Sequence, residues 1–202
     1  MLPGIIPSVG GLVTAAAANT YATWSTTDKD TAGITLSGGN LTVSGDANPR
    51  RGRANMSFGV GGKWYWEILV STVGTSGFGI ANGTWSVTTS GYLGNDVNAT
   101  GIYSSAGDFY YNGGVIFNVG ALAASDRLML AFDQSTGNFW MGKNGTWWNS
   151  GNPGTGTSPN KTVSGSTWYP AYDTRSSTST VNFGASAFTY SVPSGFNSGV
   201  YT

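Results

Sequence analysis

The chemistry open to this chain is limited by its ionisable side chains. It has no His and no Cys, so neither a Ser-His nor a Cys-His nucleophile can be assembled. A glycosidase would need two neighbouring carboxylates. Glu67 is the only Glu and lies within a predicted strand, whereas Asp108 and Asp133 lie at a strand end and a turn, where they suit hydrogen bonds to the backbone. The sequence therefore predicts a protein that is not an enzyme.

Metal and cofactor sites are not predicted either. Without His and Cys, the metal left to consider is calcium, bound by carboxylate and carbonyl oxygens. Asp28 and Asp30 flank Lys29, but the Asp-x-Asp-x-Asp-Gly pattern of a calcium loop is absent. We expect these aspartates to cap local structure, and we predict no metal and no cofactor.

Four large aromatic residues lie in predicted loops, where such side chains either pack back or bind a partner. These candidate binding residues are Trp85, Tyr92, Trp147 and Trp148. The alternative is that they fold over the edge of the domain. Trp147 and Trp148 are adjacent, and neighbours on extended backbone face opposite sides. One of them is therefore expected to cover the sheet while the other faces a partner, and such aromatics beside Asn and Ser also suit stacking on sugar rings.

Basic residues are concentrated in one predicted loop, residues 46–53, which holds Arg50, Arg51 and Arg53. Either this loop is simply solvated, or its arginines form salt bridges to a neighbouring subunit. Arg175, in a second predicted loop, is a further candidate for partner binding.

The elements that position these residues are predicted to be strands. Residues 63–71 alternate so that Trp64, Trp66, Ile68 and Val70 share one face. Strand and turn signals recur about every 8–12 residues and no amphipathic helix is apparent, which is typical of an antiparallel β-sandwich. The expected core aromatics are Trp64, Trp66, Phe132, Trp140 and Phe183.

Composition agrees with an all-β fold and excludes one class of partner. Nine Lys and Arg residues balance nine Asp and Glu residues, and only 9% of the chain is charged. Such a surface does not attract phosphate backbones, so nucleic acid is not an expected partner. The 8 Trp, 10 Tyr and 9 Phe residues supply large apolar area, and with 32 Gly they describe a many-stranded β protein.

Residues 1–20 differ from the rest of the chain. Prolines and glycines interrupt the segment, which argues against a membrane-spanning helix, and no Lys or Arg follows Met1 as in a signal peptide. We expect a short ordered extension that docks on its own domain or on a neighbouring subunit of a homo-oligomer, with residues 21–202 forming the sandwich. The candidate assembly residues are Leu2, Ile5, Ile6, Val9, Leu12 and Val13.

Four motifs in order resemble the SPRY (B30.2-type) family of β-sandwiches. Together they cover roughly residues 22–196. They are GKWYWE at 62–67, FGIA at 78–81, the hairpin at 126–145 with its KNG turn, and WYPA at 168–171 followed by VNF at 181–183, Phe188 and GF at 195–196.

The resemblance implies two packed antiparallel sheets and a binding role towards peptides, proteins or sugars. The Gly, Ser, Thr and Asn richness and the opening at 23–29 look like the versions found in bacteriophage structural proteins. We therefore expect a virion protein, a tail fibre or receptor-binding component, contacting other virion proteins and a host surface glycan or receptor. A capsid decoration protein, an intracellular peptide-binding adaptor and a lectin are the alternatives.

Overall fold

The computed structural model describes residues 18–88, 91–165 and 167–202. The assembly residues predicted between Leu2 and Val13 therefore lie outside the described residues. Within the described ranges no helix is long and apolar enough to cross a membrane. The only helical elements there are two single 3-10 turns, η1 (Trp148–Ser150) and η2 (Pro153–Thr155).

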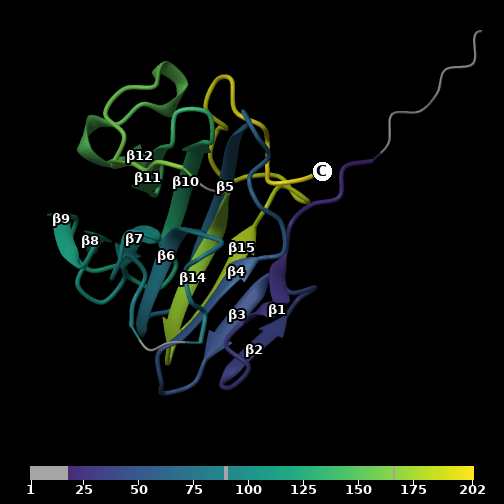
Figure 1. Ribbon diagram of the computed structural model, residues 1–202, viewed down its shortest axis with the longest axis vertical. Coiled ribbons are helices and arrows are strands. Elements are labelled where there is room, and N and C mark those ends of the chain that lie inside the picture. Colours follow the sequence, from purple (N-terminus) through teal and green to yellow (C-terminus); the bar gives the residue numbers. More distant parts are fainter. Residues whose placement is uncertain (1–17, 89–90, 166) are drawn as a thin grey trace, which may run out of the picture.

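Two antiparallel sheets form a sandwich (Figure 1), as the alternation pattern predicts. The first sheet has seven strands, in the order β1 (Trp24–Lys29), β4 (Arg50–Ala54), β14 (Trp168–Arg175), β6 (Thr75–Asn82), β7 (Ala99–Tyr103), β8 (Asp108–Tyr111) and β9 (Gly114–Asn118).

The second sheet has eight strands and contains the longest one, β5. The order is β12 (Thr146–Trp147), β11 (Asn138–Lys143), β10 (Arg127–Asp133), β5 (Lys63–Thr72), β15 (Thr178–Asn182), β3 (Thr42–Gly45) and β2 (Ile34–Ser37), with β13 (Lys161–Thr162) paired to β11.

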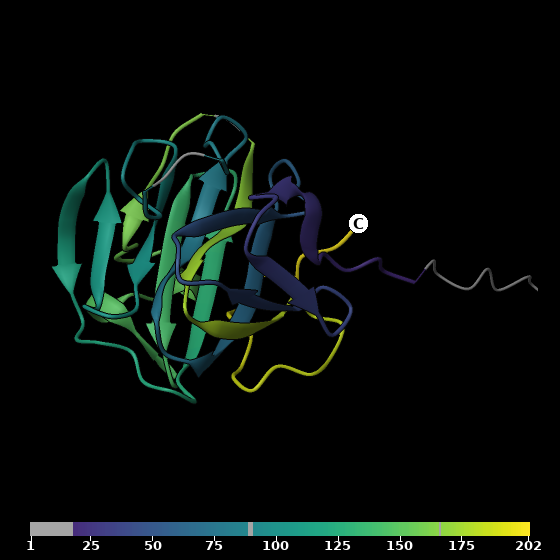
Figure 2. The same ribbon diagram turned by 90° about the horizontal axis from the view of Figure 1, so that it is seen from below.

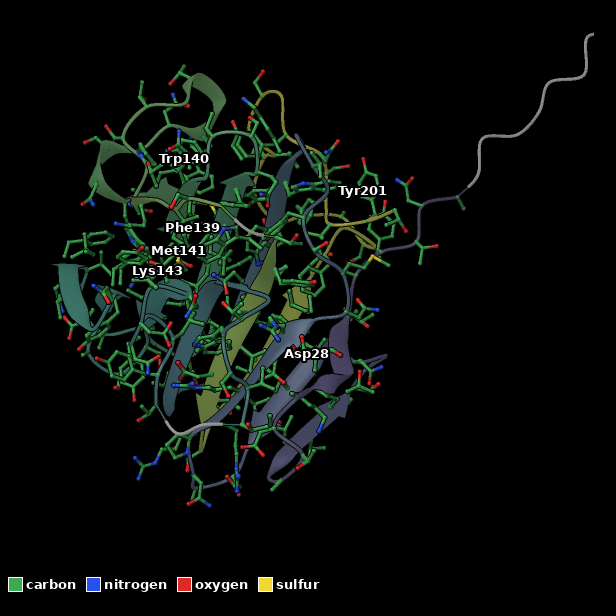
Figure 3. The ribbon with its side chains drawn as sticks, viewed as in Figure 1. Asp28, Phe139, Trp140, Met141, Lys143 and Tyr201 are labelled. Atoms are coloured by element: carbon green, nitrogen blue, oxygen red, sulfur yellow. The ribbon has the colours of Figure 1, made fainter. Side chains whose placement is uncertain are left out.

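The main core lies between the sheets and is rich in aromatic rings. Trp66 and Phe132 are fully buried there, and Phe58 packs between them with ring centroids 5.2 and 4.8 Å away. Alternation along β11 sends Phe139 and Met141 into this core and Trp140 to the outer face (Figure 3). All five aromatic residues predicted to be core are buried.

Both outer faces of the sandwich are also covered. On the eight-stranded sheet, Tyr65 and Trp140 pack against Phe188, Tyr190 and other apolar residues of the C-terminal segment. On the seven-stranded sheet, the side chains of Trp85, Val87 and Leu93 rest on small residues, namely Ala81, Ala99 and Ala171. The central strands β5 and β10 are therefore buried on both faces, which explains why they read as nearly continuous apolar runs.

The first described residues of the chain lie beside its C-terminus (Figure 2). Thr20 and Thr202 exchange two backbone hydrogen bonds of 3.0 Å each, and the rings of Tyr21 and Tyr201 pack edge to face at 5.4 Å. Thr20 is therefore paired with the C-terminus of the folded domain, and the division of the chain after residue 20 stays a prediction.

The prediction of a loop over residues 46–53 is wrong for its second half. Arg50, Arg51 and Arg53 lie on β4, which pairs with β1 on one side and β14 on the other. Arginines in a central strand are unusual because each must find partners when it is buried. The local sequence shows the three arginines but not the groups that pair with them. Those partners, which lie elsewhere in the chain, are what allow arginines in a central strand.

Packing under residues 83–98 makes a testable prediction at Gly79. A Cβ atom there would overlap the carbonyl oxygen of Thr100 and press on Leu93. We expect Gly79→Ala to lower the free energy of unfolding by about 1–3 kcal/mol, measured by urea denaturation. Gly83→Ala is the matched control because a Cβ atom at Gly83 has nothing within 4 Å. Equal midpoints for the two variants would contradict this packing.

Candidate functional site

Two of the predicted arginines hold the described parts of the β6–β7 connection, residues 83–88 and 91–98, onto the seven-stranded sheet. The Arg51 guanidinium donates to the carbonyl oxygens of Gly91 and Ser86 at 3.2 and 3.0 Å, and its carbon lies 4.9 Å from the centroid of the Trp85 ring. Arg51 is only 2% exposed. Its charge therefore organises a segment of its own chain rather than a solvated loop.

Arg53, near Arg51 on β4, also holds the β6–β7 connection onto the sheet. It forms a two-pronged ion pair with Asp28, at 2.7 and 2.8 Å, and donates to the carbonyl oxygens of Trp85 and Asn82. With 7% exposure it has little surface to offer a partner. Within the chain, Arg53 is therefore paired with Asp28, and a salt bridge from these arginines to a neighbouring subunit stays a prediction.

Arg50 is the most exposed of the three arginines but is also paired internally. It contacts Asp46 at 2.9 and 3.0 Å and Asp30 at 3.1 Å. The guanidinium holds the pKa of the Asp46 carboxyl well below its usual range. Asp28 and Asp30 are therefore ion-pair partners of arginines. The described part of the chain holds no group of three or more Asp or Glu residues that could bind a metal ion.

The loop aromatics Trp85 and Tyr92 differ in exposure. Trp85 is 1% exposed and packs with Leu93 on the outer face of the sheet, so it folds back as the alternative interpretation allowed. Tyr92 is half-buried, and its ring lies 4.7 Å from that of Tyr110 and 5.9 Å from that of Tyr103. Only Tyr92 of this pair keeps surface for a partner.

Arg175 is exposed at the end of β14. Its Nε atom donates to the carbonyl oxygen of Ala47 at 2.9 Å. The residue lies beyond the buried Arg51 and Arg53 along the same sheet, and its role in partner binding stays a prediction.

A buried carboxylate that sequence reasoning missed lies under the β6–β7 connection. Asp173 is opposite Arg51 in the β4–β14 register, and its Oδ2 atom accepts the Leu93 N–H at 2.5 Å. Burial raises the pKa of Asp173 to about 7, although the amides of Leu93 and Gly77 and the charge of Arg51 oppose the change. The signal available was an Asp between Tyr172 and Thr174 in a stretch that opens with the apolar residues of β14.

The two adjacent tryptophans face opposite sides, as predicted. Trp148 enters the main core at 9% exposure, with its ring 6.4 Å from that of Phe117. Trp147 lies on β12 and packs outside the eight-stranded sheet, 6.3 Å from the ring of Tyr65. Trp147 is half-buried, so part of its ring is accessible.

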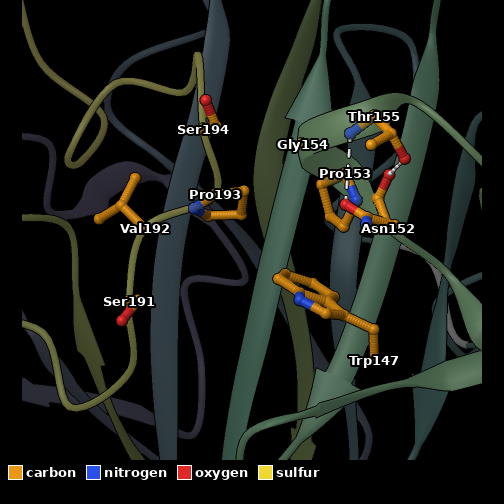
Figure 4. Close-up of a pocket in the computed structure, with 9 residues that line it drawn as sticks. All are labelled: Trp147, Asn152, Pro153, Gly154, Thr155, Ser191, Val192, Pro193 and Ser194. Atoms are coloured by element: carbon orange, nitrogen blue, oxygen red, sulfur yellow. Dashed lines mark hydrogen bonds between the residues drawn. The ribbon is translucent and has the colours of Figure 1, made fainter.

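A groove of about 470 Å³ lies over Trp147 (Figure 4). One wall is residues 152–155, including η2, and the other is residues 191–194 of the C-terminal segment. The indole ring faces the space between them, with Pro153 and Pro193 on either side. No lining residue is charged. The polar groups on the walls are the Asn152 amide and the hydroxyls of Thr155, Ser191 and Ser194.

Local hydrogen bonds make the first wall rigid. Asn152 is the N-cap of η2 and its side-chain oxygen accepts the Thr155 N–H at 3.2 Å. The backbones of Asn152 and Thr157 exchange two further bonds of 3.0 Å. The Oδ1 atom of Asn152 is thus occupied, whereas its amide nitrogen remains available towards the groove.

Glu67 positions the second wall. Its carboxylate is fully buried and accepts the backbone N–H groups of Thr189 and Tyr190 at 3.0 and 2.8 Å. The Tyr65 hydroxyl donates to it at 2.8 Å, and Arg127 lies 3.5 Å away. The residue considered above for catalysis is therefore an anchor for the segment that leads into residues 191–194.

Comparisons with known proteins identify the fold. No family model and no curated protein sequence matches this chain. The SPRY domain of human HERC1 superposes with a TM-score of 0.57 at 15% identity, covering 73% of this chain and 91% of that one. The TRIM65 PSpry domain superposes with a TM-score of 0.61 at 13% identity, covering 81% and 90%. The chain has the SPRY fold.

The SPRY-like motifs of the sequence lie on strands near the centre of this fold. GKWYWE leads into β5, FGIA lies on β6, the KNG turn follows β11, and WYPA opens β14. These strands form the sandwich interior, so the motifs report the fold. The residues that line the groove lie mainly outside them, in segments where the chain departs from strand geometry.

The raised pKa of Asp173 predicts a pH-dependent stability. The ordinary value is 3.8 and the folded value about 7, so the folded state binds the proton more tightly between these limits. Stability should therefore fall as the pH rises through that window. We expect the urea midpoint of the wild-type chain, relative to that of Asp173→Asn, to fall as the pH rises from about 4 to about 7. Parallel pH profiles for the two chains would contradict the assignment.

Proposed function

We propose that the protein is a non-enzymatic binding protein that holds a neutral, ring-bearing ligand such as a glycan in the groove over Trp147. The observation that carries this proposal is the combination of an accessible indole face with uncharged polar walls. Sugar rings stack on aromatic faces through their C–H groups, and their hydroxyls exchange hydrogen bonds with amides and hydroxyls. The absence of charge in the lining disfavours phosphates and carboxylates as ligands.

The chemistry of the buried carboxylates supports binding without catalysis. Glu67 is fully buried and accepts three hydrogen bonds, and Asp173 is 4% exposed beneath residues 83–98. Neither carboxylate lines the groove. A hydrolase acting on a glycan there would need an acid and a base at the bound bond, and the residues at the groove supply neither.

We place this binding protein in a phage virion, as a tail fibre or receptor-binding component. The support comes from the apolar extension before the domain and from a chain rich in Gly, Ser, Thr and Asn without Cys. In this proposal residues 1–17 contact other virion proteins or further copies, and the groove contacts a host surface glycan. Capsid decoration and an intracellular adaptor remain the alternative roles.

Removing the aromatic face tests the groove. We expect Trp147→Ala to weaken binding of a neutral glycan, selected on a glycan array and measured by calorimetry, by about tenfold or more, because a stacking ring at the centre of a site contributes over about 1.4 kcal/mol. Trp147→Phe should retain part of the affinity because it keeps a ring.

Tyr92→Ala is the matched control, since Tyr92 is a half-buried aromatic on the opposite sheet. Binding lost in Tyr92→Ala and kept in Trp147→Ala would move the site to the seven-stranded sheet. An array without any bound glycan, together with binding of an uncharged peptide, would favour the adaptor.

Deleting the extension tests the assembly role. Because Thr20 pairs with Thr202, the deletion should end at residue 17 and leave the domain intact. We expect the full chain to sediment as a larger species than the chain of residues 18–202, because the apolar residues between Leu2 and Val13 are then buried between copies. Identical sedimentation of the two chains would remove the basis for the assembly role.

A further inference from the structure

A second cavity beside the C-terminal segment has a charged side chain in its lining. This Arg127 pocket measures about 260 Å³ and shares no residue with the groove over Trp147. Strands β5, β10 and β15 each contribute to it, and residues 186, 187 and 189 of the C-terminal segment line it as well. The pocket is therefore a separate candidate site.

The Arg127 guanidinium has hydrogen-bond donors that its own chain does not use. A guanidinium carries five N–H donors. The Nη1 atom of Arg127 lies 3.5 Å from the Oε2 atom of Glu67, close enough for an ion pair but without a hydrogen bond. Within the described part of the chain its side chain makes no hydrogen bond, whereas each of the other four arginines makes at least one.

Glu67 does not use these donors because other groups already occupy its carboxylate. It accepts the Tyr65 hydroxyl and the backbone N–H groups of Thr189 and Tyr190. The Arg127 side chain is 26% exposed and lines the pocket, so a bound ligand can reach its donors. The pocket thus presents a partly desolvated cation to any acceptor that enters it.

The charges around Arg127 restrict the kind of anion. Asp126, its neighbour in the chain, is paired with Lys143 at 3.2 Å. Because Glu67 offsets much of the positive potential, a doubly charged phosphate gains little attraction, while its removal from water costs far more than that of a carboxylate. A carboxylate also matches the planar guanidinium through two parallel hydrogen bonds. The pocket therefore favours a single carboxylate.

The rest of the lining fits a small ligand with several hydroxyl groups. Leu41, Leu69 and Ala187 provide apolar surface. Ser186 and Thr189 provide exposed hydroxyls that make no hydrogen bond within the described residues. Sites for drug-sized ligands span about 300–1,000 Å³. A pocket of about 260 Å³ lies just below that range and suits a single sugar ring.

We propose that the Arg127 pocket binds a sugar acid, a single ring that carries one carboxylate. Arg127 holds the carboxylate through two parallel hydrogen bonds, and the hydroxyls of Ser186 and Thr189 bond to the hydroxyls of the sugar. The apolar side chains cover its C–H groups. This site lies outside the uncharged groove over Trp147 and does not depend on the function proposed for that groove.

The test is an NMR titration of the isotope-labelled full chain with glucuronate. Three probes are compared with it: glucose, the matched neutral sugar; acetate, a carboxylate without the ring; and inorganic phosphate. We expect glucuronate to bind at least about tenfold more tightly than each of the three, and to shift the amide signals of residues 186–189. Glucuronate that does not bind, that binds no better than one of the three, or that shifts only residues 191–194 beside Trp147 overturns the proposal.

Variants then assign the binding to the pocket. We expect Arg127→Gln to weaken glucuronate binding by about tenfold or more, because the charged donors are lost. Ala187→Phe should weaken it as much by filling the pocket, and it keeps the Arg127–Glu67 pair if Arg127→Gln fails to fold. Lys161→Gln is the matched control, since it removes one positive charge from β13, where Lys161 lies over the Tyr111 ring. Unchanged affinity in Ala187→Phe, or an equal loss in Lys161→Gln, overturns the proposal.

Discussion

The hydrogen bonds accepted by the Glu67 carboxylate hold the C-terminal segment on the outer face of the eight-stranded sheet. The shape of that face, including the groove, depends on them. The carboxylate lies fully buried on the longest strand and accepts two backbone N–H groups of the C-terminal segment as well as the Tyr65 hydroxyl. An irregular segment lying on a sheet leaves backbone donors without ladder partners, and such donors must be satisfied when buried. The Glu67 side chain does this for residues 189–190 and thereby positions the wall of the groove.

On the outer face of the seven-stranded sheet, irregular backbone also needs hydrogen-bond partners. There the partners are mainly positively charged arginines, which donate to carbonyl oxygens. Arg51 and Arg53 donate to carbonyl oxygens of the β6–β7 connection, while Asp173 accepts one of its N–H groups. Glycines on β6 and β7 have no side chain, which leaves room for Leu93 to pack directly against the strands. Only 9% of the residues are charged, yet several of these are buried, where their hydrogen bonds hold irregular backbone in place.

The C-terminal segment and the β6–β7 connection cover much of the two outer faces, and this coverage determines which surfaces stay accessible to partners. The groove exists because Trp147, on β12, packs on the outer face beside the C-terminal segment while Trp148 enters the core. The Arg127 pocket lies beside residues 186 and 187 of the same segment.

The sequence by itself determined the β-sandwich, the SPRY-like strand motifs and the opposite orientation of Trp147 and Trp148, because alternation has a period of two and needs only neighbouring residues. It did not determine that residues 50–54 form a strand, that Glu67 anchors the C-terminal segment, or that Asp173 is buried beside Arg51. Those outcomes were decided by tertiary structure. A buried charge is tolerated only with partners, and here the partners come from segments about 35 to 120 residues away in the chain, a separation that local patterns do not encode.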